Sequence, residues 1–290
     1  MWPSIAVIQN NVLIAFGPLI YWVVFGGAMV YYCIKYPSYR NMISYICLFA
    51  SVFGIVASII SLLAANWGRN IEQPAYFFFY GLYITFGFLP PIVAFYTGEK
   101  RMKQSSAGKY ATCLGFLWAV ACILGSLTTT IMAAIIAHHG FFEDEELLLR
   151  LSGGLHFVIL MNWGFIAVLL LLTLIYSKHL TQKHARSSFL VYVTLNVLSA
   201  LVFTILAFAV LEFHFFTIHV LGYLTIFLVD LPFAVAVFIA FHMSHSWIGN
   251  NQGNLISNEV HDAQTCQAQN NNGADANTND GSKYELSNNV

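Results

Sequence analysis

Seven long apolar runs, separated by short polar connections, dominate the pattern of this chain. They are Val12–Ile34, Met42–Ala65, Ala75–Tyr96, Ala111–Ala137, Leu155–Tyr176, Phe189–Leu211 and Ile218–Met243. A helix needs about 20 apolar residues to cross the hydrocarbon core of a bilayer, and every run is that long. The pattern therefore predicts an all-α membrane protein with a seven-transmembrane helix bundle, in which short connections make neighbouring helices antiparallel.

Lys and Arg are distributed unevenly between the two sets of connections. Connections one, three and five hold nine of these residues, whereas connections two, four and six hold two. The positive-inside rule then places the short N-terminus, residues 1–11, outside the cell and the chain after the seventh run in the cytoplasm. The bundle spans residues 12–245. Residues 246–290 are rich in Asn, Gln, Ser and Gly, which predicts a disordered cytoplasmic tail.

Composition narrows the class of protein further. The chain is 58% hydrophobic and 9% charged, whereas soluble domains carry about 25% charged residues. A net charge of −1 argues against nucleic acid as a partner and leaves the lipid bilayer as the expected one. The chain contains no His-Glu-x-x-His, no Gly-x-Ser-x-Gly and no phosphate-binding glycine loop. The case for an enzyme is therefore weak, and no cofactor is predicted.

The seventh run contains Asp230, the one ionisable residue near the centre of any run. No Lys or Arg lies inside the seven runs, so three states remain open. The acid is protonated and hydrogen-bonded, or it faces a hydrated cavity or a sodium ion, or it receives a cationic ligand. Pro232 adds a second feature, because its ring frees the carbonyl of Leu228 and makes this point a candidate movable joint. Pro90-Pro91 should likewise kink or end the third helix.

Other polar residues inside the runs are candidate ligand contacts. Thr128 and Thr129 lie in the outer half of the fourth run, Asn162 in the fifth and Asn196 in the sixth. Together they predict an outward-facing pocket for a small-molecule ligand. The alternative is structural, because such side chains often bond carbonyls of their own helix or hold helices together. Gly26-Gly27 should let the first helix pack closely.

Two further groups lie at the ends of the runs. Five histidines at the predicted outer ends could titrate near neutral pH or bind a metal such as zinc, although interfacial histidines are common. They are His138, His139, His156, His214 and His219.

The basic connections on the cytoplasmic side could bind a partner or simply anchor the helices in anionic lipid. Their candidate residues are Lys100, Arg101, Lys103, Lys183 and Arg186.

The topology resembles that of a G-protein-coupled serpentine receptor. The segment Lys35-Tyr36-Pro37-Ser38-Tyr39-Arg40-Asn41 is similar to the short basic first intracellular loop of rhodopsin-like receptors. Asp230-Leu231-Pro232 resembles, with one extra residue, the Asn/Asp-Pro-x-x-Tyr pattern of their seventh helix. The chain departs from that family in having no Cys in an outer connection. The resemblance implies a plasma-membrane receptor that senses a small ligand and signals to a G protein or another cytoplasmic partner.

A second function also fits the sequence. A carboxylate at bilayer depth is typical of proton relays and ion pathways. Asp230 therefore leaves open a proton- or ion-coupled transporter or a lipid exporter, in which the acid takes up and releases protons or sodium.

Overall fold

The computed structural model describes residues 12–67, 73–97, 106–139, 144–176, 183–209 and 223–248. Within these ranges lie seven helices that are long and apolar enough to cross a membrane. They are α2 (Val12–Lys35), α3 (Met42–Trp67), α4 (Gln73–Thr97), α6 (Ser106–His139), α7 (Asp144–Tyr176), α8 (Lys183–Phe208) and a seventh that combines η4 (Ile226–Asp230) with α10 (Leu231–His242). The predicted all-α, seven-helix membrane bundle is confirmed.

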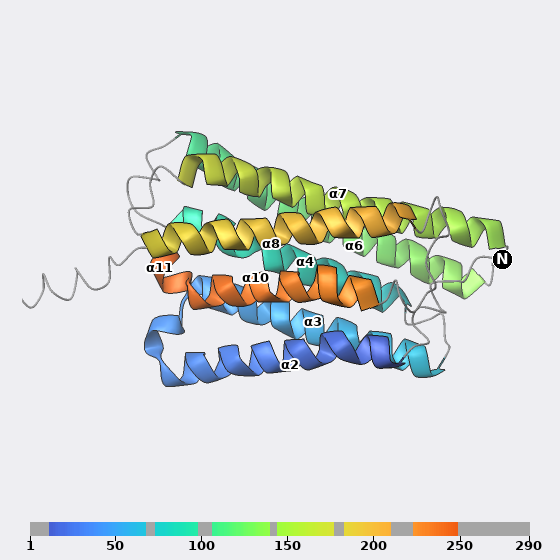
Figure 1. Cartoon of the computed structure of the whole chain (residues 1–290). Coiled ribbons are helices and arrows are strands. Elements are labelled where there is room, and N and C mark those ends of the chain that lie inside the picture. The colour runs from blue at the N-terminus through green and yellow to red at the C-terminus, as the bar shows by residue number, and fades with distance from the viewer. Residues whose placement is uncertain are drawn as a thin grey trace, which may run out of the picture. The chain divides into compact units, whose positions relative to one another are not determined.

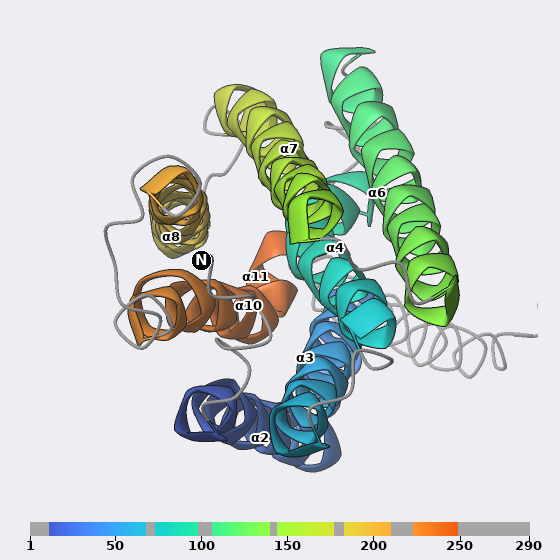
Figure 2. The same cartoon turned by 90° about the vertical axis from the view of Figure 1, so that its right-hand side faces the viewer.

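The seven helices lie side by side, and α4 occupies the interior of the bundle (Figures 1 and 2). Helix α4 packs against α3, α6, α7 and α10, and 72% of the residues in its apolar window are buried. In the other six spans this share is between 17% and 44%. The polar groups of α4 are therefore the ones that must find partners inside the protein.

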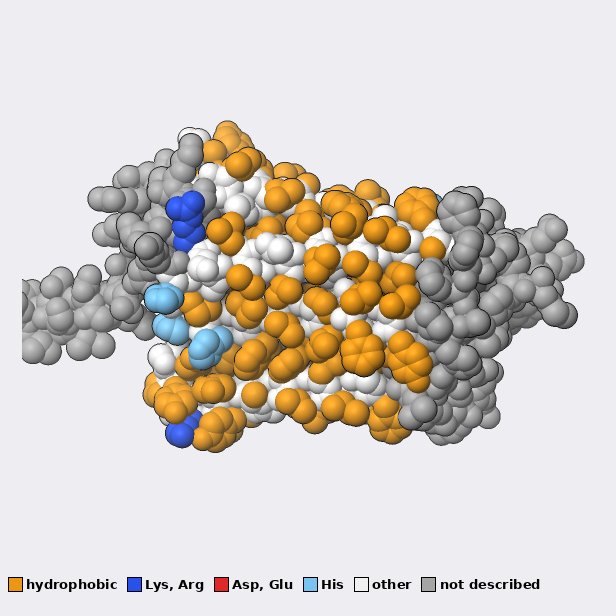
Figure 3. Space-filling view, in the orientation of Figure 1, with side chains coloured by type: hydrophobic (Ala, Val, Ile, Leu, Met, Phe, Trp, Pro, Cys, Tyr) orange, Lys and Arg blue, Asp and Glu red, His pale blue; other side chains and the backbone are white. Residues whose placement is uncertain are grey.

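The outer surface of the bundle is apolar. Figure 3 shows hydrophobic side chains along the length of the bundle, and Lys, Arg and His side chains at the end that carries α11 (Ser244–Ile248). Helix α6 contacts mainly α4 and α7, and exposes a row of large side chains, Leu114, Leu117, Val120, Leu124 and Ile131. Such a surface is stable in lipid and unstable in water, which is consistent with a multi-pass membrane protein.

The end of the bundle with α11 also carries η1 (Pro37–Tyr39), the short 3-10 turn between α2 and α3. This is the end that the Lys and Arg distribution predicts to be cytoplasmic. The Arg40 side chain donates hydrogen bonds to the carbonyls of Cys33 (2.9 Å) and Ile34 (3.0 Å) and so caps the end of α2. The described residues all lie in one compact unit that ends at Ile248, and the predicted tail beyond it lies outside the described residues.

Several helices begin earlier than the apolar runs predict, and the prolines of α4 do not end it. Helix α4 does not end at Pro90-Pro91 but continues to Thr97, one residue beyond the predicted run. Helix α7 starts at Asp144, inside the acidic stretch that the sequence pattern treats as a connection, rather than at Leu155. Acidic residues in a first turn are favourable because they face the positive end of the helix dipole.

Glycines allow close helix contacts at a few positions. A Cβ on Gly26 would collide with the Ser51 hydroxyl of α3, as the close packing predicted for the first helix requires. Gly27 has no such role, since nothing lies within 4 Å of the position of its Cβ. At Gly54 of α3, the Trp22 ring fills the space that a side chain would need.

Candidate functional site at the centre of the bundle

The helix that carries Asp230 changes its hydrogen-bond register just before this residue. Residues Ile226–Asp230 form a π-helical turn, and the N–H of Leu231 donates to the carbonyl of Ile226, five residues earlier. Such turns contain one residue more than an α-helical turn and are frequent at functional sites. Pro232 follows at the start of α10, where its missing N–H cannot complete an α-helical bond. The backbone interruption thus includes Asp230 itself.

Asp230 lines a small cavity between four helices. Asn162 of α7, Ser199 of α8, and Tyr80 and Tyr83 of α4 line the same cavity. The space open to the centre of a water molecule is about 10 Å³, which is room for about one water. The sequence identified Asp230 and Asn162 separately as candidate site residues, and both line this cavity.

The hydrogen bonds around this cavity use part of the polar capacity of its lining side chains. The Asn162 side-chain amide nitrogen donates one of its two hydrogens to the carbonyl of Val158 (3.0 Å), and its oxygen is an acceptor. The Ser199 hydroxyl donates to the carbonyl of Val229 (2.6 Å), so only its lone pairs remain. Among the described residues, none donates a hydrogen bond to the Asp230 carboxyl group.

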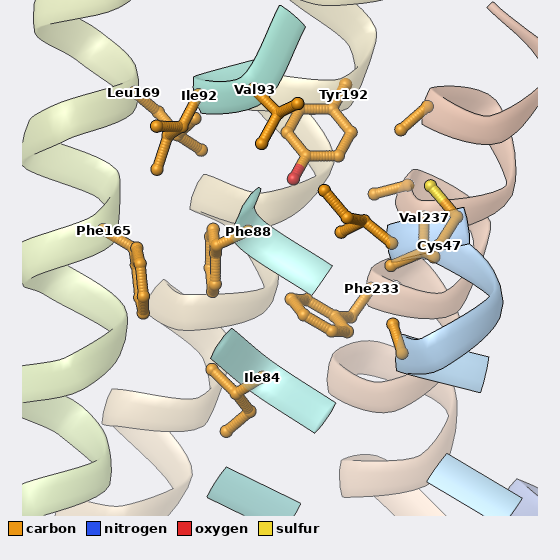
Figure 4. Packing of buried hydrophobic residues seen from close by; sticks show 14 of the residues in the cluster. Cys47, Ile84, Phe88, Ile92, Val93, Phe165, Leu169, Tyr192, Phe233 and Val237 are labelled. Carbon is orange, nitrogen blue, oxygen red and sulfur yellow. The ribbon is translucent and has the colours of Figure 1, made fainter. Parts of the chain in front are cut away.

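A second interrupted helix lies beside the first. The N–H that would bond the Gly87 carbonyl in α4 is missing, because the residue four positions later is Pro91. The Tyr192 hydroxyl of α8 donates to that carbonyl instead (2.6 Å), and both residues are buried. Figure 4 shows the Tyr192 ring beside Val93. A tyrosine from a neighbouring helix thus satisfies the carbonyl that the proline leaves unpaired.

Aromatic rings fill the space between these two interruptions. Phe88 lies between Phe165 and Phe233 (Figure 4), with ring centroids 4.8 Å from the first and 5.3 Å from the second. Phe233, which directly follows Pro232, packs against Gly87, where a Cβ would collide with its ring. The proline-interrupted segments of α4 and α10 are therefore in direct contact.

Helix α8 presents its polar side chains to this region on one face. Tyr192, Asn196 and Ser199 are spaced four and three residues apart, which places them along one stripe of the helix. Asn196 donates to the carbonyl of Tyr192 (2.8 Å), and its own side-chain oxygen is buried without a hydrogen-bond partner. A buried acceptor without a donor costs about 1–3 kcal/mol, so this face of α8 is under-satisfied in the conformation described.

At the predicted cytoplasmic end, η1 and α11 hold the ends of α8 and α10. The Trp247 indole donates to the Ser188 hydroxyl of α8 (3.2 Å), and its ring packs on Tyr192. Tyr39 of η1 shares a hydrogen bond with the Nδ1 atom of His242 (3.1 Å). Burial raises the pKa of Tyr39 and lowers the pKa of His245, whose ring lies against Tyr39.

The threonines predicted to join the pocket do not line this cavity. The hydroxyls of Thr128 and Thr129 donate to the carbonyls of Leu124 (2.9 Å) and Gly125 (2.8 Å) in their own helix. Asn196 is buried near the cavity face of α8 but is not among the lining residues. Of the six residues predicted for ligand binding or switching, Asp230 and Asn162 line the cavity and Pro232 adjoins it.

The predicted histidine and basic groups are only partly described. His156 is exposed on α7, and its ring edge faces Phe208 at 6.4 Å between centroids. His138 and His139 belong to the last turn of α6, but their side chains, like His214 and His219, lie outside the described residues. In the part of the chain that the structure describes, no group of three or more His, Cys, Asp or Glu side chains could hold a metal ion.

Two of the candidate partner-binding residues, Lys183 and Arg186, fall in the described helices. Arg186 is exposed in the first turn of α8, which begins at Lys183. Lys100, Arg101 and Lys103 lie outside the described residues. A larger groove of about 720 Å³ lies between the ends of α4 and α6 at this side of the bundle, and none of the predicted site residues lines it.

Tyr192, Ser199, Tyr80 and Tyr83 belong to the site but were not predicted from the sequence. The signal for the first two was present, since Tyr192 and Ser199 flank Asn196 at helical spacing in the sixth run. No protein-family model, curated protein or solved structure matches this chain. Inferences about function therefore rest on the chain's own residues.

Proposed function

We propose that this protein is a seven-transmembrane receptor that senses a small ligand and signals to a cytoplasmic partner such as a G protein. The membrane in which it works is expected to be the plasma membrane. The observation that carries the proposal is the way α8 connects both interrupted helices: Tyr192 donates to α4 and Ser199 donates to the turn before α10.

The two bonds make α8 a candidate moving element. Tyr192 and Ser199 are seven residues apart, which is two turns or about 10 Å along the helix. A rotation or outward shift of α8 would break both bonds together, and at its cytoplasmic end it would also break the bond between Trp247 and Ser188. Switching proteins use helices that have two discrete packing arrangements, and a ligand acts by binding one arrangement more tightly.

A signal would then travel from the cavity to the cytoplasmic end. A ligand that binds in the outer half of the bundle and displaces Ser199 or the π turn would break the hydrogen bond from Ser199 to Val229, which restrains α8. Release of Trp247 would expose the inner ends of α8 and α10 to a partner. The side chain of Arg186 is exposed at that end of α8 and is available to bind acidic groups of such a partner.

The experiment measures coupling in living cells. The full chain, tagged on its C-terminus, is expressed together with resonance-energy-transfer sensors for the main G-protein classes, and basal and ligand-induced recruitment is recorded over a broad small-molecule panel. Tyr192→Phe is expected to raise basal recruitment because it removes one restraint on α8. Thr194→Ala, an exposed position on the same helix, is the matched control and should leave basal recruitment unchanged.

Absence of recruitment by any sensor, with the protein present at the cell surface, would count against the receptor. A single observation favours a second function, a proton- or ion-coupled transporter or lipid exporter: Asp230 lines a cavity between four helices of the bundle, beside the polar side chains of Asn162 and Ser199. Flux of a labelled lipid or an ion into reconstituted vesicles, lost in Asp230→Asn, would support transport and contradict the simple receptor.

A further inference from the structure

We propose that the groove between the ends of α4 and α6 binds one anionic phospholipid from the leaflet at the predicted cytoplasmic end. The proposal does not depend on the receptor function, since a receptor and a transporter are both surrounded by lipid. It follows from the shape of the groove, from its apolar walls and from one unpaired lysine near its end.

The groove lies beside a close contact between α6 and α4. At Gly115 of α6, an added Cβ would lie 2.9 Å from the side chain of Ile92 in α4. The stretch of α6 that lines the groove begins with small residues, among them Gly108, Thr112 and Cys113. These residues leave a space of about 720 Å³ unfilled, within the range of about 300–1,000 Å³ that is usual for ligand pockets.

The walls of the groove match an acyl chain. Leu117 and Val120 line it from α6, and both side chains are more than half exposed. Tyr96 of α4 and Phe116 of α6 meet edge to face, with ring centroids 5.9 Å apart. The Thr112 hydroxyl donates to the carbonyl of Gly108 in its own helix (2.8 Å). An exposed apolar groove on a membrane-spanning helix is therefore open to lipid and suited to bind it.

Lys109 gives the groove a positive charge. It lines the groove in the first turn of α6, its side chain is exposed, and no described residue forms an ion pair or a hydrogen bond with it. None of the described residues that line the groove is acidic. Basic pockets between helices on the cytoplasmic side bind anionic headgroups, which are concentrated in that leaflet. The charge therefore selects an anionic lipid over a zwitterionic one.

The positions of the polar and apolar parts agree with one leaflet of a bilayer. Tyr96 and Tyr110, beside Lys109, are 63% and 77% exposed, and exposed tyrosines are typical of the headgroup level. Val120 lies 11 residues further along α6, which is about 16 Å. Half of the hydrocarbon core is about 15 Å thick. A headgroup beside Lys109 would thus place its acyl chain along the groove as far as Val120.

The test is photo-crosslinking of the full chain in nanodiscs of phosphatidylcholine that contain a small fraction of lipid with a diazirine in its acyl chain. The labelled lipid is phosphatidylserine or, in a parallel sample, phosphatidylcholine with the same chain, and labelled residues are mapped by peptide mass spectrometry. We expect labelling at Phe116, Leu117 and Val120 to be about fivefold higher with phosphatidylserine, which is the factor for one lysine near an anionic headgroup.

Two pairs of variants separate charge from shape. Lys109→Gln should lower labelling by phosphatidylserine to the phosphatidylcholine level, whereas Arg186→Gln, an exposed cation on α8, should leave the preference unchanged. Cys113→Phe would fill the groove from an exposed position and should reduce labelling by both lipids. Leu114→Phe, at an exposed position of the same helix that does not line the groove, is its control.

Three results would overturn the proposal. Equal labelling of the wild type by the two lipids, or labelling spread evenly over the exposed residues of α6, would mean that the groove holds only bulk lipid. A preference for phosphatidylserine that survives in Lys109→Gln would place the recognition of charge elsewhere. An acyl group bound to Cys113 as a thioester, found in the intact mass, would make the occupant a covalent modification of the chain.

Discussion

The bond between Tyr192 and Gly87 allows a sharp test of how a proline is tolerated in the most buried helix. Replacing Tyr192 with Phe keeps the ring and its packing and removes the one donor that reaches the Gly87 carbonyl. That carbonyl has no helical donor because the residue four positions later is Pro91. The variant therefore leaves a buried acceptor without a partner.

The expected loss of stability follows from these contacts. An unsatisfied buried acceptor costs about 1–3 kcal/mol, and hydrogen bonds between membrane helices contribute about 0.6 kcal/mol on average, with a maximum of about 1.7. We expect Tyr192→Phe to destabilise the bundle by about 1–2 kcal/mol, which corresponds to a fall in midpoint of about 2–8 °C for a chain of this size. Tyr45→Phe, at an exposed position on α3, should change the midpoint little.

A double-mutant cycle separates this cause from general damage to the core. Pro91→Ala restores the N–H that the Gly87 carbonyl lacks, so the tyrosine hydroxyl is no longer needed. Thermal midpoints of the wild type, both single variants and the double variant are measured in the same detergent. Tyr192→Phe should cost about 1 kcal/mol less in the Pro91→Ala background than in the wild type.

Equal losses in the two backgrounds would refute the reasoning. They would mean that the Tyr192 hydroxyl stabilises the bundle for some reason unrelated to the missing bond at Pro91.

The remaining predictions concern glycine packing and pH. Gly54→Ala should destabilise the bundle by about 1–3 kcal/mol, because its Cβ would lie 2.8 Å from the Trp22 ring. At Gly27 an added Cβ would have no neighbour within 4 Å, so Gly27→Ala should instead raise stability by about 0.5–1 kcal/mol. Thermal unfolding of the two variants checks both predictions, because the midpoint should fall in Gly54→Ala and rise in Gly27→Ala. Burial lowers the pKa of His245, so the unfolded chain binds the proton more readily and the folded state should lose stability as the pH falls below about 6.5. The thermal midpoint should fall between pH 7.5 and 5.5, and His245→Gln should reduce this fall. His184→Gln serves as the control. An equal fall in the two variants would contradict the assignment to His245.

The number and class of the helices could be predicted from the sequence because lipid imposes a simple requirement. A run of about 20 apolar residues has few stable structures other than a spanning helix, since every backbone group must be bonded within the segment. Helix ends were less predictable. Helix α7 extends into an acidic stretch, where favourable helix-dipole interactions compensate for polarity that the hydrophobic pattern treats as a connection.

The effect of Pro90-Pro91 shows why local rules were insufficient. Proline chemistry predicts a lost bond at Gly87, and that loss is present. Whether the helix then ends depends on a donor from a helix that is distant in sequence, and Tyr192 lies 105 residues away. No local pattern contains that information. Of the two outcomes predicted for Pro90-Pro91, a kink or an early end, the early end is excluded because α4 continues to Thr97.

The candidate site was predictable only in part, because the sequence reports which residues are polar but not which of them meet in space. Asp230 was identified by the cost of a carboxyl group at bilayer depth, and Asn162 was identified as one of the polar residues inside the apolar runs. Thr128 and Thr129 belong to the same class of polar residue but satisfy themselves within α6, and only the structure separates the two cases. Tyr80 and Tyr83 could not be found, because tyrosines in an apolar run give no sign of which face they occupy.

The π turn at Ile226–Asp230 has a consequence for how the seventh span tolerates changes in length. Each residue of an α-helix advances the chain by about 100°, so the extra residue of a π turn offsets the two halves of the span by that angle. Deleting one residue, such as Leu228, would remove the wide turn and rotate the segment before it relative to α10, while Phe233 keeps its contacts with Gly87 and Phe88 of α4. A change of one residue in this turn therefore alters which side chains before it face the bundle. The packing of α10 against α4 stays the same.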